Sequence, residues 1–159
     1  MANVIFIGHD VRLIGKTPVN YARWNVDETI TLSQFAMGFK NWAASEMKKS
    51  PDTRITLKLW AHGRPGQLQF CKEWITLQTV QILRPLQPFV YLIEIYGCQL
   101  GRGSDGNALC SYMAALLQSY VRAAKDTQYY SYRGEGDALD FGGWEGITTT
   151  WGPAGNIVE

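Results

Sequence analysis

The chain contains 159 residues, of which 46% are hydrophobic and 18% are charged, and its formal net charge is +1. These values are ordinary for a globular protein, and the length fits one domain over residues 1–159 with a core of its own. A nearly neutral chain argues against a nucleic-acid binder with a large basic surface. Because no apolar run approaches the roughly 18 residues that cross a bilayer, and the N-terminus lacks the features of a signal peptide, we expect no membrane contact and a cytoplasmic location.

Cysteine and histidine are scarce in this chain. The three cysteines, Cys71, Cys98 and Cys110, are an odd number without a CxxC spacing, which favours a reducing compartment over a disulfide framework. The two histidines, His9 and His62, have no further ligands at metal-binding spacing. The sequence therefore predicts neither a metal site nor a cofactor.

The first half of the chain alternates between strand and helix patterns. Residues 3–8 form an apolar run that ends in glycine and indicates a buried strand, whereas residues 10–28 are irregular and predict a surface loop or an edge excursion. Apolar side chains at helical spacing predict an amphipathic helix over residues 31–49. Residues 54–61 alternate in a way that is typical of a second strand.

The next segments predict a hairpin, a short helix and a third strand. Proline has no N–H for a strand ladder, so Arg64-Pro65-Gly66 is expected to end the second strand in a turn, with residues 67–74 returning as a hairpin arm. Thr76 is a plausible N-cap for a short helix that is broken at Pro85. Residues 89–96 are strongly apolar and predict the third strand.

Beyond this strand, we expect a helix that Ser104 or Asp105 caps and that runs to about Tyr120. Strands are then predicted over residues 120–124 and 144–151. This alternation indicates an α/β fold, a three-layer sandwich with a mostly parallel central sheet covered on both faces. In such sheets, functional groups gather at the carboxyl ends of the strands.

A cysteine and a histidine each follow a predicted strand. His62 and Cys98 are separated by about one hairpin and one helix, a connection long enough to place their strands side by side. A thiol at neutral pH is only a few per cent thiolate, and a nearby imidazole raises that fraction and later protonates the leaving group. The N–H groups of Gly63 and Cys98 are suited to holding an oxyanion. The sequence therefore predicts a catalytic dyad of Cys98 and His62.

These motifs resemble those of caspase-like cysteine peptidases, the fold shared by caspases, gingipains, legumains and separases. In that family, His-Gly follows one apolar strand and the nucleophilic cysteine follows the next, as His62-Gly63 and Gly97-Cys98 do here. The resemblance implies a caspase-like fold and peptidase chemistry on a peptide or protein. Tyr96 stands where an acidic or polar residue often precedes the cysteine pair, so the family's substrate pocket does not carry over.

Residues 54–146 also resemble a caspase-related bacterial domain of unknown function that occurs in large secreted repeat proteins. The similar motifs are His62-Gly63-x-Pro65-Gly66-x-Leu68-x-Phe70, Tyr96-Gly97-Cys98, Gly103-x-x-Gly106 and Phe141-Gly142-Gly143-Trp144-Glu145.

Simpler interpretations accompany each candidate. Cys98 also fits a buried structural thiol, and His62 fits a core histidine bonded to a backbone carbonyl. His9-Asp10 fits a turn at the end of a strand. The functional alternative is that these two residues orient His62 or line the cleft. Tyr96 and Arg64 are further candidates for lining the cleft. We therefore predict a cysteine hydrolase, most simply a peptidase, and keep as the alternative a catalytically inactive caspase-like module that binds a partner.

Overall fold

The computed structural model describes residues 3–18, 20–127, 131–132, 139–140, 144 and 146–158. Its main sheet has six strands, which are β1 (Asn3–Asp10), β2 (Ala22–Val26), β3 (Arg54–Trp60), β6 (Leu92–Tyr96), β7 (Tyr120–Ala124) and β10 (Thr148–Trp151). The spatial order is β10-β7-β6-β3-β1-β2, in which β10 runs antiparallel to β7 and the other pairs are parallel. This arrangement confirms the predicted α/β fold with a mostly parallel sheet.

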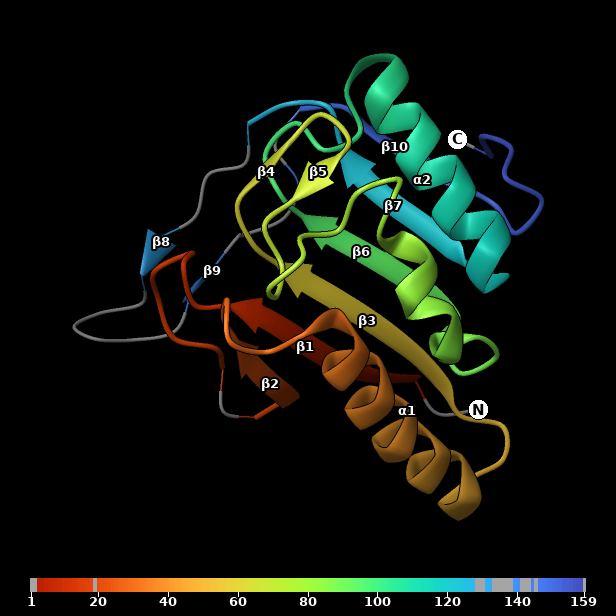
Figure 1. Cartoon of the computed structure of the whole chain (residues 1–159). Coiled ribbons are helices and arrows are strands. Elements are labelled where there is room, and N and C mark those ends of the chain that lie inside the picture. Colours follow the sequence, from red (N-terminus) through yellow and green to blue (C-terminus); the bar gives the residue numbers. More distant parts are fainter. Residues whose placement is uncertain are drawn as a thin grey trace.

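Three helices cover one face of this sheet, as Figure 1 shows. They are α1 (Leu32–Lys49), the 3-10 helix η1 (Val80–Leu86) and α2 (Gly103–Leu117). η1 lies between α1 and α2 and contacts both. No second helical layer occurs on the opposite face within the described part of the chain. The described residues also form two short antiparallel pairs, namely the hairpin of β4 (Gly63–Arg64) with β5 (Gln67–Leu68), and the pair of β8 (Ser131–Tyr132) with β9 (Leu139–Asp140).

The helix α1 forms where the apolar spacing predicted it. Thr31 caps its start, because the Thr31 hydroxyl accepts from the Gln34 N–H and the Gln34 side chain accepts from the Thr31 N–H. Phe35 and Phe39 are fully buried against the sheet, where the Phe39 ring packs 5.1 Å from the ring of Phe6 on β1. The amphipathic pattern therefore marks the face that joins the core.

Two predicted elements differ in the structure. The segment over residues 10–28 contains the edge strand β2, which pairs in parallel with β1 through residues that alternate in burial. The predicted short helix is η1, a 3-10 helix that includes Pro85 rather than ending there. A 3-10 turn loses a single i to i−3 bond at proline, and Gln87 N still donates to Arg84 O at 3.0 Å.

The start of α2 also differs from the prediction. The N-cap is Arg102 rather than Ser104 or Asp105, and the first helical bond runs from Gly106 N to Arg102 O at 3.1 Å. A Cβ on Gly106 would lie 2.4 Å from the carbonyl carbon of Gly101. Close packing of the first helical turn on the preceding loop therefore decides where the helix begins.

The two faces of the sheet have different chemistry. Ile55, Leu57 and Leu59 of β3 face the helices and are fully buried in the main core. On the other face, Trp60 and Tyr96 belong to a smaller hydrophobic cluster with Ile7 and Leu13, and charged side chains lie beside it. Glu94 there is 3.9 Å from Lys58 Nζ and 3.9 Å from Arg122 NH1. The alternation of residues along β3 thus gives the sheet one apolar face, which the helices cover, and one face that carries both apolar and charged side chains.

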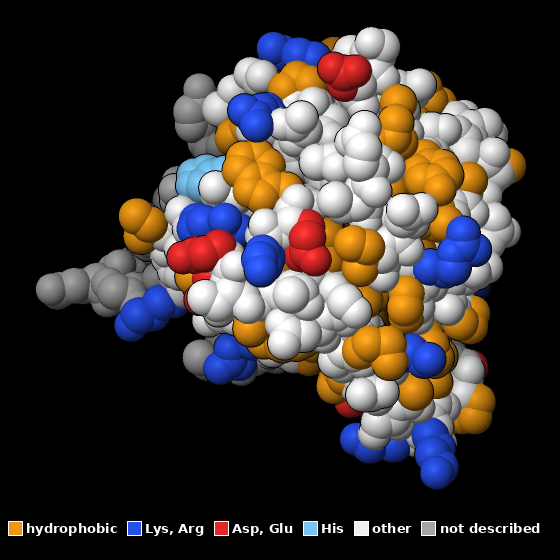
Figure 2. Space-filling view, viewed as in Figure 1, with side chains coloured by type: hydrophobic (Ala, Val, Ile, Leu, Met, Phe, Trp, Pro, Cys, Tyr) orange, Lys and Arg blue, Asp and Glu red, His pale blue; other side chains and the backbone are white. Residues whose placement is uncertain are grey.

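Basic and acidic side chains are interspersed among apolar ones on the face that Figure 2 shows. Among the residues that the structure describes, no helix is long and apolar enough to cross a membrane.

Candidate functional site

The strands that precede His62 and Cys98 are neighbours in the sheet. β3 and β6 pair in parallel with Trp60 opposite Tyr96, so each motif leaves the sheet at the same edge. Their backbones touch there, because a Cβ placed on Gly63 would lie 3.1 Å from the Gly97 Cα and 3.2 Å from the Cys98 N. Figure 1 shows the arrowheads of β1, β3 and β6 at one edge, with the β4–β5 hairpin beside it. The absence of a side chain at Gly63 permits this approach.

The His62 side chain is exposed and is held by a backbone carbonyl. Its Nε2 lies 3.0 Å from Arg12 O, and because a carbonyl only accepts, Nε2 must donate. In the neutral imidazole, Nδ1 is then the nitrogen with a free lone pair. The His62 carbonyl in turn accepts from the Gln69 N–H at 2.8 Å. Both the ring and the backbone of His62 are therefore fixed.

Arg12 is positioned by the turn that follows β1. The buried Asp10 carboxylate accepts from Arg12 Nε at 2.8 Å and from Arg12 NH2 at 2.7 Å, and it also accepts from the Cys71 N–H at 2.9 Å. This carboxylate raises the pKa of the Arg12 guanidinium through hydrogen bonding. Asp10 thus acts on His62 indirectly, through the placement of the Arg12 carbonyl.

His9 is fully buried near the end of β1, beside the same turn. Its Nε2 donates to Leu13 O at 2.7 Å, and its Nδ1 forms a hydrogen bond with the Thr17 hydroxyl at 2.8 Å. Burial lowers the pKa of His9, because the charged imidazolium loses its hydration there. His9 therefore holds the turn and does not reach the surface beside His62.

The hairpin after His62 forms where Arg64-Pro65-Gly66 predicted a turn, although it is shorter than the predicted arm. Gly63 lies opposite Leu68, and in the adjacent pair Gln69 N donates to His62 O at 2.8 Å. Hydrogen-bonded and non-hydrogen-bonded pairs alternate in an antiparallel ladder, so Gly63 and Leu68 form a non-hydrogen-bonded pair. The Gly63 N–H therefore points away from β5. Gly66 N donates to Leu100 O at 3.0 Å, which fastens the hairpin to the loop that follows Cys98.

The three cysteines lie in different surroundings. Cys98 is half-buried in the turn after β6, whereas Cys71 and Cys110 are fully buried. Burial raises the pKa of the Cys71 thiol to about 12, and that of the Cys110 thiol to about 12 as well. Since a thiolate is the reactive form, burial disfavours reaction at Cys71 and Cys110.

A small pocket opens beside His62. It has a volume of about 110 Å³ and is lined by His62, Gly63, Arg64, Gln69 and Trp74. The Arg64 guanidinium lies 5.0 Å from the centre of the Trp74 ring and donates to the Gln67 side chain. Of the four residues suggested for the cleft, Arg64 lines this pocket and His9, Asp10 and Tyr96 do not.

Tyr96 belongs instead to the sheet face away from the helices. Its ring stacks on Trp144 with 4.3 Å between centroids, and burial raises its pKa to about 12. Trp144 is the described member of the predicted glycine and tryptophan motif, whereas Phe141, Gly142, Gly143 and Glu145 lie outside the described residues.

Left-handed backbone conformations surround the site. Cys71, Trp74 and Gln99 have φ values of 61°, 63° and 58°, although none of them is glycine. Such conformations cost free energy and persist where the surrounding structure enforces them, frequently at functional sites. Gln99 directly follows Cys98 and is held by a bond from its N–H to Asp126 O at 3.0 Å.

Three residues of this region were missed by sequence reasoning, namely Arg12, Gln69 and Trp74. The spacing of Asp10 and Arg12 could have predicted the position of Arg12, because an acidic side chain two residues before an arginine can form an ion pair with it across a turn. Gln69 and Trp74 gave no signal, since their proximity to His62 depends on the hairpin. Among the described residues, no group of three histidine, cysteine, aspartate or glutamate side chains is arranged to hold a metal ion.

Comparisons with known proteins identify a family without an assigned activity. No curated protein and no solved structure matches the chain significantly. The family model described as "Domain of unknown function (DUF4347)" matches residues 28–138, which overlap with the region 54–146 that carries the resemblance noted above. Because this match covers more than half of the chain, the protein belongs to the DUF4347 family.

Proposed function

We propose that this protein is a cysteine hydrolase, most simply a peptidase, in which Cys98 is the nucleophile and His62 is the general base and acid. The observation that carries the proposal is the contact of Gly63 with the Gly97-Cys98 peptide at the carboxyl edge of β3 and β6. This backbone contact joins the residue after His62 to the peptide of the half-buried Cys98 at the carboxyl ends of two parallel strands, where functional groups commonly lie, and it supports the assignment of both residues to one site.

The orientation of His62 supports the assignment of its role. With Nε2 donating to Arg12 O, the lone pair of Nδ1 is available to take the proton of Cys98 Sγ. The resulting thiolate attacks the substrate carbonyl carbon, and the N–H groups of Gly63 and Cys98 hold the oxyanion. His62 then protonates the leaving amine, and a water activated by His62 hydrolyses the thioester and regenerates the thiol.

The test is the reactivity of the three thiols in the folded protein. Electrophilic peptide probes with varied side chains beside the reactive group are added, and the labelled cysteine is identified by mass spectrometry. We expect labelling at Cys98, loss of labelling in Cys98→Ala, and a labelling rate that falls at least about tenfold in His62→Ala, since a general base contributes 10²- to 10⁴-fold. Cys110→Ala is the matched control and should label as the parent does.

Two outcomes decide against the proposal. If Cys98 reacts no faster than a free thiol such as glutathione, or if His62→Ala leaves its rate unchanged, the two residues do not act as a dyad. The protein would then be a non-catalytic module on this fold. Thermal unfolding of each variant is measured alongside, because a Cys98→Ala protein that unfolds identifies Cys98 as a structural thiol.

A further inference from the structure

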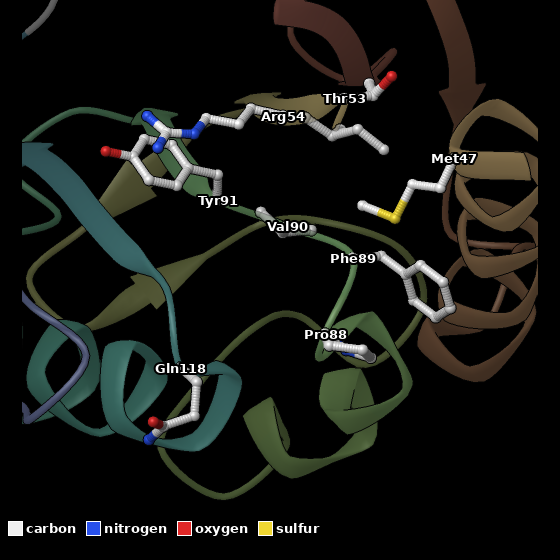
Figure 3. A pocket seen from close by; sticks show the side chains of 9 residues that line it. Met47, Thr53, Arg54, Pro88, Phe89, Val90, Tyr91 and Gln118 are labelled. Carbon is white, nitrogen blue, oxygen red and sulfur yellow. The ribbon is translucent and has the colours of Figure 1, made fainter. Parts of the chain in front are cut away.

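A second pocket lies at the sheet edge opposite the candidate active site. It has a volume of about 280 Å³ and is formed where α1 ends, where β3 begins and where the chain enters β6. In the parallel part of the sheet these are the amino ends of the strands, whereas His62 and Cys98 follow the carboxyl ends. Figure 3 shows Arg54 and Tyr91 on one side of the hollow and Met47 and Phe89 on the other.

One side of this pocket is apolar. Met47 and Phe89 are half-buried and pack against the main core, and Val90 is buried beneath them. Each of these side chains also lines the pocket. A ligand that enters therefore meets hydrocarbon surface whose burial from water is favourable.

The other side carries a positive charge. The Arg54 guanidinium lies 4.4 Å from the centre of the Tyr91 ring. Within the described residues, this guanidinium forms no ion pair, and Asp52, the nearest acid in the sequence, accepts a hydrogen bond from the Ser50 hydroxyl at 3.0 Å. A guanidinium presents several N–H donors in a plane that matches a carboxylate, and stacking on an aromatic ring leaves its edge available.

The walls of the pocket are fixed by the sheet. Tyr91 N donates to Ile55 O at 3.0 Å, and Tyr91 O accepts from the Tyr120 N–H at 3.0 Å. Arg54 is the first residue of β3 and pairs with Asn3. The cation and its aromatic support are thus held before any ligand arrives, which lowers the entropic cost of binding.

A neighbouring pocket lacks this property. It has a volume of about 200 Å³ and is lined in part by Arg122. Arg122 NH1 lies 3.9 Å from Glu94, and Arg122 also hydrogen-bonds to the Thr148 hydroxyl. The Glu94 carboxylate already compensates the charge of Arg122, so the pocket beside Arg54 is the more favourable site for an anion.

We propose that the pocket beside Arg54 binds a small organic anion, namely a carboxylate that is attached to an apolar chain. The carboxylate pairs with the edge of the Arg54 guanidinium, and the chain lies against Met47, Phe89 and Val90. The volume is near the lower end for ligand pockets, which limits the ligand to a few carbon atoms beyond the acid group.

Hexanoate is the probe, and binding is followed by amide chemical shifts of the isotope-labelled protein. We expect shifts at Arg54, Val90 and Tyr91 and a Kd of about 1 mM, as ligand efficiencies of small molecules allow. Hexanamide has nearly the same shape without the charge and should bind about two- to fivefold more weakly, because an exposed ion pair contributes at that level.

Two variants separate the charge from the apolar wall. Arg54→Gln should weaken hexanoate about two- to fivefold and leave hexanamide unchanged, whereas Met47→Gln should weaken both ligands. Arg23→Gln is the matched control, because Arg23 is also exposed but lies on β2 and does not line the pocket. Cys98→Ala should bind hexanoate as the parent does, since this site does not depend on the proposed dyad.

Several results would overturn the proposal. The first is equal affinity for hexanoate and hexanamide, and the second is unchanged hexanoate binding in an Arg54→Gln protein that folds normally. Amide shifts confined to residues outside the pocket would also contradict it. So would the absence of shifts at about 10 mM hexanoate, a concentration tenfold above the expected Kd.

Discussion

Replacement of Gly63 by alanine tests the contact between the two motifs. The new Cβ would lie 3.1 Å from both the Gly97 Cα and the Gly97 carbonyl carbon, and 3.2 Å from the Cys98 N. All three are backbone atoms, so no side chain can rotate away to relieve the crowding. The β4 backbone and the Gly97-Cys98 peptide must therefore separate by a few tenths of an ångström.

The magnitude follows from that geometry. Overpacking by one methyl group costs about 1 kcal/mol of unfolding free energy at the lower end of the usual range, which corresponds to a loss of about 2–4 °C in Tm for a chain of this length. Removal of one oxyanion donor costs about 10²- to 10³-fold in kcat. A displaced donor retains part of its effect, so we expect Gly63→Ala to reduce acyl transfer by about 10- to 100-fold.

The assay measures acylation of Cys98 by an activated ester together with thermal unfolding. Gly8→Ala is the control, because its Cβ would lie 2.9 Å from the Phe70 ring and crowds the core rather than the Gly97-Cys98 peptide. It should lose stability and keep its acylation rate. Gly63→Ala with an unchanged acylation rate would remove Gly63 from the oxyanion site and would weaken the case for the dyad.

Three further changes have defined outcomes. Asp10→Asn should lower the unfolding free energy by about 2 kcal/mol, because a buried carboxylate with four N–H partners is replaced by an amide, and unaltered chemical denaturation would contradict this role. Since burial lowers the pKa of His9 below its ordinary 6.5, the unfolded chain binds more protons, so stability should fall as the pH drops below about 6.5. His9→Gln should flatten this dependence in unfolding experiments between about pH 7 and pH 5, and an equally steep dependence would exclude His9 as its source. Glu94→Gln should cost about 1 kcal/mol at low salt and less at high salt, because the Lys58 and Arg122 partners are partly exposed, and a salt-independent loss would rule out an ionic contribution.

The sequence by itself determined the class of the fold and the edge of the sheet at which the candidate site lies. Apolar runs at residues 54–61 and 89–96 predicted the strands β3 and β6, and the helical spacing at residues 31–49 predicted α1. These features are local, because side-chain periodicity and capping depend on neighbours within one or two turns. His62 and Cys98 follow parallel strands, so their common edge could be derived from the strand pattern.

The tertiary structure alone decided the contacts that give the site its geometry. Arg12 is distant from His62 in the sequence, and its carbonyl reaches the imidazole because Asp10 holds the turn after β1. The start of α2 was mispredicted for a similar reason, since the helix begins where Gly106 packs on Gly101 rather than where a capping side chain is available. The Arg54 pocket likewise depends on three segments that meet at one sheet edge. Such features arise from long-range packing, which residue patterns within a single segment do not encode.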